Sequence, residues 1–224
     1  MATAEQATEP LVAGDRLTRE EFLRRWEAMP GLKRAELIGG VVYMSSALPR
    51  KHAVMENDTS CWLATYRAFT PGCEAGNNAT WKMLRDSPQP DIDLRILPEC
   101  GGQSGMDGPF AKGAPELLAE ICLSSTSYDL HQKLELYLAA GVKEYLAVLL
   151  NSNEVRWHRL IANDYQVLPA DADGVIRSRV FPGLWLQVDA LLADDMPKVL
   201  ETLHRGLQSP EHAEFVELLK RRRS

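Results

Sequence analysis

Two acidic side chains on neighbouring predicted strands could act together in catalysis. The stretch QPDIDLRI, residues 89–96, alternates apolar residues with Asp91, Asp93 and Arg95. Successive side chains of a strand point to opposite faces, so these three polar residues share one face. In LLAEICL, Glu120 interrupts what otherwise reads as a buried strand. An ionised carboxylate in an apolar interior is costly unless it is paired, exposed or bound to a metal.

If the two strands pair, the carboxylates of Asp91 and Glu120 can converge on one point, as metal-assisted hydrolysis of a phosphodiester bond requires. Hard cations such as Mg²⁺ commonly take one or two protein carboxylates together with water and substrate phosphate. The reaction also needs a cationic side chain that orients water and offsets charge. Cys122, two residues beyond Glu120, cannot supply it. Lys133, in the second turn of the next predicted helix, has a stem long enough to reach the metal site.

Each of these residues also has a simpler interpretation. Asp91 and Asp93 would need no function if they faced solvent on an edge strand. Glu120 could form a structural salt bridge with Lys133 or with Arg95. Lys133 could be an ordinary surface lysine, because HQKLELY also reads as an amphipathic helix. The residues by themselves leave these alternatives open.

The elements that must position these residues alternate between helices and strands. Thr18 and Glu21 form a capping-box pattern at the start of a helix, and Gly39-Gly40 joins two short strands. Further helices are predicted near 49–69, 128–140 and 196–222. The second of these has Thr126 or Ser127 as its N-cap, and the third is broken at Ser209-Pro210. Further strands are predicted near 79–85, 90–96, 115–123, 144–151, 154–161, 165–168, 175–180 and 184–188. This order predicts a single α/β domain with a mixed central sheet flanked by helices.

The chain divides into three predicted parts. Residues 1–16 are small, polar and without periodicity, which predicts a disordered leader. Residues 17–193 form the predicted folded domain, and residues 194–224 a C-terminal helical extension. The Gly-rich segment 98–114 contains no GxxxxGK[ST] phosphate-binding motif and is predicted to be a mobile connection.

Composition limits the function. The 224 residues carry a net charge of −6, which counts against indiscriminate binding of nucleic acid, and positive charge is confined to clusters such as PRKH at 49–52 and KRRRS at 220–224. No apolar run approaches the roughly 20 residues that span a bilayer. The N-terminus lacks the features of a secretory signal, so we expect a cytoplasmic protein without a membrane partner. Four scattered cysteines without CxxC spacing predict reduced thiols, with neither a zinc site nor disulfides.

Several stretches together resemble the Uma2 family, formerly a domain of unknown function, within the PD-(D/E)XK nuclease superfamily. They are LTREEFLRRWEAMPGLKRAELIGGVVYM, PRKH, QPDIDLRI, PELLAEICLSSTSYDLHQKLELYLAAGVKEYLAV and the Trp-containing strand that follows, and they span about residues 17–190. The order of the Glu-containing strand, the turn after it, the D…K helix and GVxEY carries the resemblance; PD alone would not. The resemblance implies a restriction-endonuclease-like fold.

The resemblance also implies cleavage of nucleic acid, most readily DNA, by an endonuclease that depends on Mg²⁺ or Mn²⁺. It places the first acidic metal ligand at Asp91, the second at Glu120 and the lysine function at Lys133. Glu36, in AELIGG, matches an acidic position of the N-terminal motif and is an auxiliary site residue in this scheme. His52 matches a recurring histidine to which no role is assigned. The superfamily further suggests a homodimer, which would join the basic clusters into one groove.

Two other functions stay open at this stage. The chain could be a catalytically silent nucleic-acid-binding or protein-interaction module on the same fold, or a metal-dependent hydrolase of a small phosphorylated substrate. Three departures from the family's pattern concern the site: Gly39 stands where ELIDG has aspartate, the usual Ser-Pro-Ser-Thr turn lacks its proline, and Cys122 replaces an aliphatic residue. None of them removes a proposed metal ligand.

Overall fold

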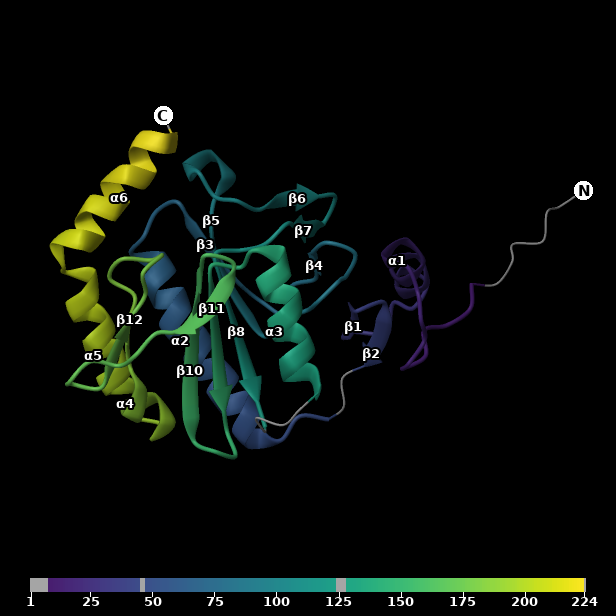
Figure 1. Ribbon diagram of the computed structural model, residues 1–224, viewed down its shortest axis with the longest axis horizontal. Helices are drawn as coiled ribbons and strands as arrows, with labels where there is room; N and C mark the ends of the chain where they lie inside the picture. The colour runs from purple at the N-terminus through teal and green to yellow at the C-terminus, as the bar shows by residue number, and fades with distance from the viewer. Residues whose placement is uncertain (1–7, 45–46, 124–127, 224) are drawn as a thin grey trace, which may run out of the picture.

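A mixed sheet forms the centre of the molecule. The computed structural model describes residues 8–44, 47–123 and 128–223. Within these ranges the central sheet has the strand order β11-β10-β9-β8-β5-β3 (Figure 1). Its strands are Cys73–Asn77 (β3), Ile92–Ile96 (β5), Leu117–Cys122 (β8), Glu144–Leu149 (β9), Glu154–Ile161 (β10) and Asp164–Val167 (β11). β8 and β9 run parallel and the other neighbours antiparallel, so the mixed sheet is confirmed.

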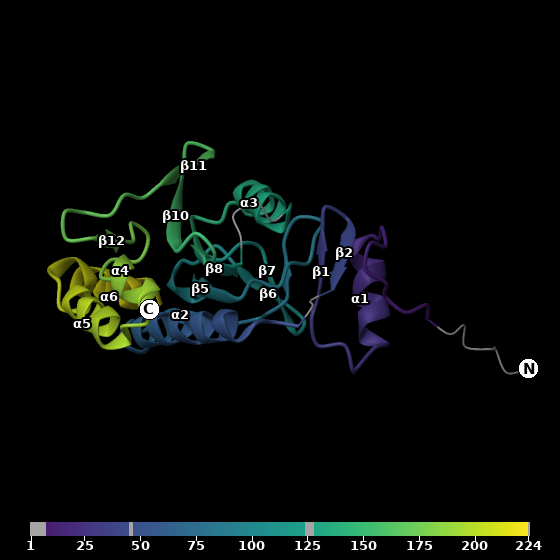
Figure 2. The ribbon, with the colours of Figure 1, turned by 90° about the horizontal axis from the view of Figure 1, so that it is seen from below.

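Helices cover both faces of this sheet. The helices of the described residues are Arg19–Glu27 (α1), Arg50–Ala68 (α2), Tyr128–Ala140 (α3), Val188–Leu192 (α4), Met196–Leu207 (α5) and Pro210–Arg223 (α6). Of these, α1 packs on β1, away from the central sheet. Figure 2 shows α2 and α3 on opposite faces, with α5 packed beside α2. The α/β class, the flanking helices and the helical C-terminal segment are therefore as predicted. None of the helices in the described part of the chain has the length and apolar character needed to cross a bilayer.

Each face of the sheet has its own apolar core. Trp62 and Tyr66 of α2 pack with Ile92 and Leu94 of β5, and the same core takes in Leu203 of α5. On the other face, the core under α3 joins Leu136 and Tyr137 to strand residues such as Leu118 and Ala147. This burial on both faces explains why β8 and β9 are mostly apolar, with Glu120 and Glu144 as the exceptions.

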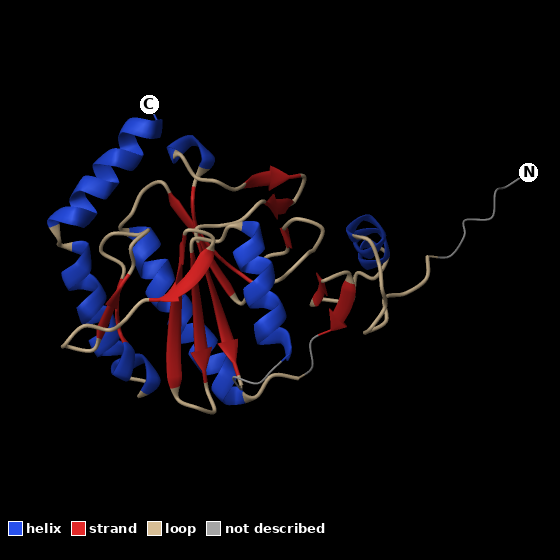
Figure 3. Cartoon of the chain, viewed as in Figure 1, coloured by secondary structure: helices blue, strands red, loops and turns tan. Residues whose placement is uncertain are grey.

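Small sheets complete the described fold (Figure 3). They pair Ala35–Ile38 (β1) with Val41–Met44 (β2), Val175–Arg177 (β12) with Trp185–Gln187 (β13), and Phe110–Lys112 (β7) with both Trp81–Lys82 (β4) and Gly105–Asp107 (β6). The β1–β2 turn uses Gly39 and Gly40 with φ of 59° and 73°, as the predicted two-residue turn requires. We call α1, β1 and β2 the N-terminal module; it encloses Phe22, Leu37 and Val42.

Part of the predicted disordered leader packs on the N-terminal module. Leu11 is buried in the core of the module, and Val42 N donates to the Asp15 carbonyl at 2.9 Å. The prediction of disorder is therefore wrong for the segment around these residues. Residues 1–7 of that prediction lie outside the described residues, and so do the predicted N-caps Thr126 and Ser127.

The strand expected at 79–85 is reduced to β4. Met83 and Asp86 exchange backbone hydrogen bonds of 3.1 and 2.7 Å, which closes a tight turn directly after β4. Leu84 within this turn has a φ of 48°, a conformation that a strand residue does not adopt.

The segment 98–114 is not the mobile connection that its glycines suggested. It contains a 3₁₀ helix at Pro98–Cys100 and the β6–β7 hairpin, which pairs with β4. Gln103 N donates to the buried Glu116 carboxylate at 3.0 Å, which anchors the segment to the start of β8.

Candidate active site

The carboxylates of Asp91 and Glu120 lie on adjacent strands. β5 and β8 pair with Ile92 opposite Ala119, and the same register carried on by one residue sets Asp91 opposite Glu120. Residues directly opposite in an antiparallel pair project on the same face. Both side chains are buried, with Asp91 8% and Glu120 5% exposed. The structure therefore brings together the two carboxylates that the sequence predicted to converge.

The Lys133 ammonium lies between two glutamates. α3 follows β8 and covers one face of the sheet, and its second turn carries Lys133. Lys133 Nζ is 3.0 Å from Glu120 Oε1 and 3.0 Å from Glu36 Oε1. Lys133 is only 9% exposed, so the interpretation as an ordinary surface lysine is wrong. The salt bridge with Glu120, the other simple alternative, is present.

Glu36 reaches this group from the N-terminal module. It lies on β1, and its Oε1 also accepts a hydrogen bond from Gln89 N at 2.7 Å. The Gln89 side chain also contacts β1, because its Oε1 accepts a hydrogen bond from Ala35 N at 3.2 Å. The residues just before Asp91 thus hold β1 against the site.

Tyr137 is a site residue that the sequence did not identify. Its hydroxyl donates to Glu120 Oε1 at 2.6 Å, and the side chain is fully buried. From the sequence it reads as a core residue of α3, which it also is. The spacing could have indicated that Tyr137 lies near Glu120, because Tyr137 is four residues after Lys133 and therefore on the same face of the helix.

Asp91 is held by the backbone and lies beside His52. Ile121 N donates to Asp91 Oδ2 at 2.8 Å. His52 Nε2 is 3.7 Å from the same oxygen, and His52 Nδ1 is 3.8 Å from Glu56 Oε2. Both distances are too long for a hydrogen bond. His52, to which the sequence assigned no role, thus lies at the edge of the site, and Glu56 was not identified from the sequence.

The site holds more negative than positive charge. Burial, only partly offset by Lys133, raises the pKa of Glu120 to about 8. Burial also raises the pKa of Asp91, against the opposing effect of the hydrogen bond from Ile121 N. Burial alone would lower the pKa of Lys133, but the carboxylates of Glu120, Glu36 and Asp91 outweigh it and raise that pKa. Three acidic side chains around one ammonium favour the binding of a further cation.

Asp91 and Asp93 do not face solvent. β5 lies between β3 and β8, so it is not an edge strand, and Asp93 is 4% exposed. Asp93 Oδ1 accepts a hydrogen bond from Trp81 Nε1 at 3.2 Å, and burial raises the pKa of Asp93 to about 6. Arg95, the other candidate partner of Glu120, pairs with Glu74. The edge-strand interpretation and the Arg95 salt bridge are therefore wrong.

Asp91 and Glu120 offer the oxygen donors that a hard divalent cation needs. Asp91 Oδ1 and Glu120 Oε2 accept no hydrogen bond from any described residue. No group of three or more His, Cys, Asp or Glu side chains close enough to hold a metal ion occurs within the described ranges. Mg²⁺ commonly uses one or two protein carboxylates, because water and substrate phosphate complete its coordination. The donors fit Mg²⁺ or Mn²⁺ in an open two-carboxylate site.

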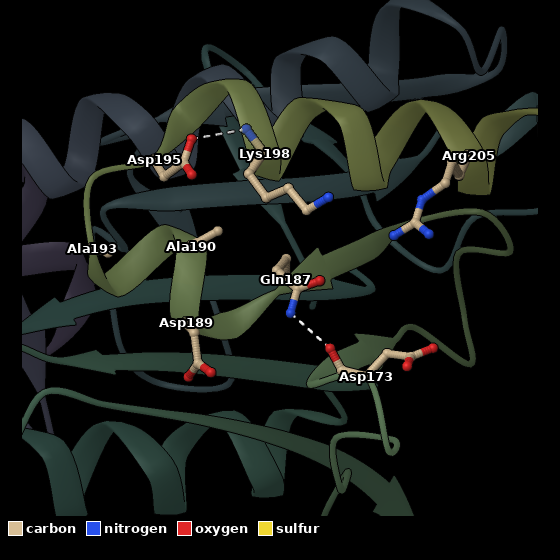
Figure 4. A pocket seen from close by; sticks show the side chains of 8 residues that line it. All are labelled: Asp173, Gln187, Asp189, Ala190, Ala193, Asp195, Lys198 and Arg205. Carbon is tan, nitrogen blue, oxygen red and sulfur yellow. Dashed lines mark hydrogen bonds between the residues drawn. The ribbon is translucent and has the colours of Figure 1, made fainter.

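A separate surface hollow contains none of these residues. It has a volume of about 540 Å³ and lies between β13, α4 and α5 (Figure 4). In the close-up view, Lys198 and Arg205 extend from α5 toward the space beside Gln187. It is lined by Asp173, Gln187, Asp189, Ala190, Ala193, Asp195, Lys198 and Arg205. The lining carries both acidic and basic side chains, whereas three carboxylates surround the single ammonium of Lys133 in the candidate site.

The family of the chain follows from comparison with known sequences. The model of the Uma2 family, described as "Putative restriction endonuclease", matches residues 19–189. The chain belongs to the Uma2 family. A comparison with curated proteins finds no match.

This Uma2 chain is also similar to a solved structure, the "Crystal structure of a putative nuclease belonging to DUF820 from Anabaena variabilis ATCC 29413". The two share 18% sequence identity with a TM-score of 0.61, and the match covers 79% of this chain and 98% of the other. At this level of identity the likeness shows the fold alone. The fold class that the resemblance implied is confirmed.

Proposed function

We propose that this Uma2 chain is a Mg²⁺-dependent endonuclease that hydrolyses phosphodiester bonds in DNA. The observation that carries the proposal is the position of the Lys133 ammonium, 3.0 Å from both Glu120 and Glu36 in a buried acidic group that includes Asp91. Membership of the family described as "Putative restriction endonuclease" supports a nuclease. The metal and the choice of DNA are our inference from the donors and from the resemblance.

Asp91 and Glu120 are the proposed metal ligands. A divalent ion bound there would supply Lewis acidity toward a phosphate oxygen and a more acidic water. Ile121 N fixes Asp91 through Oδ2, and Tyr137 fixes Glu120 through Oε1, so each carboxylate has one constrained oxygen and one that accepts no described donor. Held in this way, the two acidic side chains lose little conformational freedom when the ion binds.

Lys133 is the proposed residue that positions water and stabilises negative charge on the phosphate. An ammonium has three N–H donors, and two of them face Glu120 and Glu36. The third remains available for a water or a phosphate oxygen. Because its pKa is raised by the carboxylates that outweigh burial, Lys133 stays protonated at neutral pH and acts as a donor and a charge instead of a base. Glu36 assists as a second carboxylate that holds Lys133, at 3.0 Å from the ammonium.

Cleavage of supercoiled plasmid and of single-stranded DNA tests the proposal. Wild type and Glu120→Gln, purified in parallel, are incubated with Mg²⁺, Mn²⁺ or EDTA. Glu99→Gln is a matched control, because Glu99 is exposed and lies outside the site. We expect metal-dependent nicking by wild type and the control, and its loss in Glu120→Gln and in EDTA.

Equal background cleavage in wild type and Glu120→Gln would contradict the proposal. DNA binding without any cleavage would then identify a catalytically silent module. Hydrolysis of a small phosphodiester such as bis(p-nitrophenyl) phosphate, with intact DNA, would identify the hydrolase of a small substrate instead.

A further inference from the structure

We propose that the turn at 83–86, directly after β4, is a contact site for duplex DNA. Leu84 enters a groove of the duplex, and Arg85 pairs with its phosphate backbone. The inference rests on the proposed function, because it takes DNA as the substrate, and it adds a contact outside the acidic group around Lys133. It begins with two neighbouring side chains at the tip of the turn that are both exposed, Leu84 by 57%.

The backbone of Leu84 is strained. Its φ of 48° lies in the left-handed region, where the β-carbon of any residue other than glycine is crowded. The exposed side chain gains little from packing, so the core does not explain why a leucine occupies this position. Residues held in such conformations are concentrated at functional sites. The strained leucine therefore indicates that its side chain is needed at the surface.

The tip of the turn is held rigidly from the N-terminal module. Arg19 Nη1, at the start of α1, donates to the Leu84 carbonyl at 2.7 Å. Gly40 N, in the turn between β1 and β2, donates to Asp86 Oδ1 at 3.1 Å. These bonds add to the backbone pair that closes the turn itself. A contact surface that is already ordered loses little entropy on binding, which favours affinity.

Positive charge accompanies the exposed leucine. The Arg85 side chain makes no hydrogen bond or ion pair with any described residue, whereas Arg19 lies 3.6 Å from Glu20. An arginine without a partner is suited to a phosphate, and an apolar side chain beside it can act as a wedge in a groove of DNA. The tip borders a hollow of about 690 Å³, which is lined by Leu17, Thr18, Arg19, Glu20, Gly39, Gly40, Leu84, Arg85 and Asp86.

The turn lies within reach of a duplex bound at the candidate active site. Arg85 precedes Asp91 by six residues, so their Cα atoms are at most about 21 Å apart. Residues 86–91 are all buried, and Gln89 N is bonded to Glu36, which fixes the spacing. This distance corresponds to about six base pairs of DNA. One duplex can therefore place a phosphate at the proposed metal site and contact the turn.

Binding of the full chain to a fluorescein-labelled DNA duplex, measured by anisotropy in EDTA, tests the inference. Arg85→Ala should bind about tenfold more weakly than wild type at about 50 mM salt and only about twofold more weakly at about 500 mM, because one lost phosphate contact lowers the salt slope by about 0.9. Leu84→Gly should bind at least about fivefold more weakly at both salt concentrations, because it loses an apolar contact. Its melting temperature should not fall below that of wild type, since glycine adopts a positive φ without strain.

The matched controls are an exposed arginine and an exposed apolar residue elsewhere. Arg67 lies in the last turn of α2, and Val167, at the end of β11, has the same 57% exposure as Leu84. Arg67→Ala and Val167→Ala should bind within about twofold of wild type, because neither residue belongs to the proposed contact.

Gly39 allows the charge of the hollow to be changed without disturbing the turn. A β-carbon on Gly39 would meet no atom within 4 Å, and its φ of 59° is one that Asp and Asn adopt more readily than other residues. Gly39→Asp adds a carboxylate, and Gly39→Asn adds nearly the same shape without the charge. At about 50 mM salt, Gly39→Asp should bind at least about threefold more weakly than Gly39→Asn.

The possible failures can be told apart. A wild type that cleaves DNA, with Leu84→Gly and Arg85→Ala binding it as tightly as wild type, would overturn the role of the turn and leave the proposed function standing. Equal losses in Arg67→Ala and Arg85→Ala would also overturn that role. Binding that requires Leu84 and Arg85 without any cleavage would support the contact and overturn the nuclease. A wild type that neither binds nor cleaves DNA would overturn both.

Discussion

Two buried glutamates on neighbouring parallel strands differ in the groups that hydrogen-bond to their carboxylates. Glu144, at the start of β9, accepts hydrogen bonds from Trp157 Nε1, Ser178 Oγ, Arg179 N and Val180 N, at 2.7 to 3.2 Å. Among the described residues it forms no ion pair. Glu120, on β8, accepts from Lys133 and Tyr137 and has two further carboxylates near it.

The difference separates a structural carboxylate, Glu144, from Glu120, which we propose is functional. All the donors to Glu144 are neutral, and they link β9 and β10 to the segment around Ser178. The donors to Glu120 include an ammonium that Glu36 and Asp91 also attract. Burial raises the pKa of both glutamates, so a raised pKa alone does not distinguish them. What distinguishes Glu120 is the excess of negative charge around it, which a metal ion would neutralise.

The largest effect we expect is on activity. Glu120→Gln removes a proposed metal ligand with little change of shape, and it should lower the rate of DNA cleavage at least about a thousandfold, since a bound metal contributes several kcal/mol of transition-state stabilisation. Initial rates of plasmid nicking at saturating Mn²⁺ measure this. Glu144→Gln should cleave at a rate within about threefold of wild type per folded molecule, and equal losses in both variants would contradict the comparison.

The next largest effect is on stability, and it is expected at Glu144 instead of Glu120. Glu144→Ala removes the acceptor of two buried donors, Trp157 Nε1 and Ser178 Oγ, and of two partly buried backbone N–H groups, which should lower the free energy of unfolding by about 3 kcal/mol. Urea denaturation followed by circular dichroism measures the change. Glu99→Ala, at an exposed position, should change it by less than about 0.5 kcal/mol. A Glu144→Ala protein as stable as wild type would show that these hydrogen bonds are not needed.

A smaller effect concerns pH in the metal-free protein. The pKa of Glu120 is raised from 4.5 to about 8, so its contribution to stability is fully present below pH 4.5 and is lost as the pH rises through about 8. Glu120→Gln cannot ionise and lacks this dependence. Between pH 6 and 9 in EDTA, wild type should lose about 2–3 kcal/mol of unfolding free energy relative to Glu120→Gln. Parallel pH profiles of the two proteins would contradict the raised pKa.

The smallest effect compares two tyrosine hydroxyls. Tyr137→Phe removes the 2.6 Å hydrogen bond to Glu120 and should cost about 1 kcal/mol of unfolding free energy. Tyr145→Phe is the matched control, because the buried Tyr145 hydroxyl has no hydrogen-bond partner among the described residues. Its loss should cost less than about 0.5 kcal/mol. Equal costs for the two variants would show that the bond to Glu120 adds nothing.

The sequence indicated the residues at the centre of the proposed site because its signals are local. An alternating strand holds Asp91, an apolar strand is interrupted by Glu120, and the next helix carries Lys133, so each residue lies in an element that its neighbours specify. The same signals predicted most helices and the mixed sheet. They failed at β4, where a turn between Met83 and Asp86 interrupts an apolar segment that reads as a strand.

Residues whose role depends on distant partners could not be predicted. In the sequence, Glu144 precedes an apolar run and Glu120 lies within one, so the two look alike. Only the hydrogen-bond donors to Glu144, 13 to 36 residues further along the chain, show that Glu144 is structural. His52 and Glu56 are one helical turn apart, but nothing in α2 indicates that Asp91 lies on the other side of the imidazole. The contact arises only when α2 packs across the sheet.

Isothermal titration calorimetry of Mn²⁺ with wild type, Glu120→Gln and Glu144→Gln tests the central claim most directly. The account predicts that wild type and Glu144→Gln bind Mn²⁺ with affinities within about threefold of each other, while Glu120→Gln binds at least about tenfold more weakly. A wild type that binds no Mn²⁺, or a Glu120→Gln protein that binds it as tightly as wild type, would contradict the claim that Glu120 is a metal ligand.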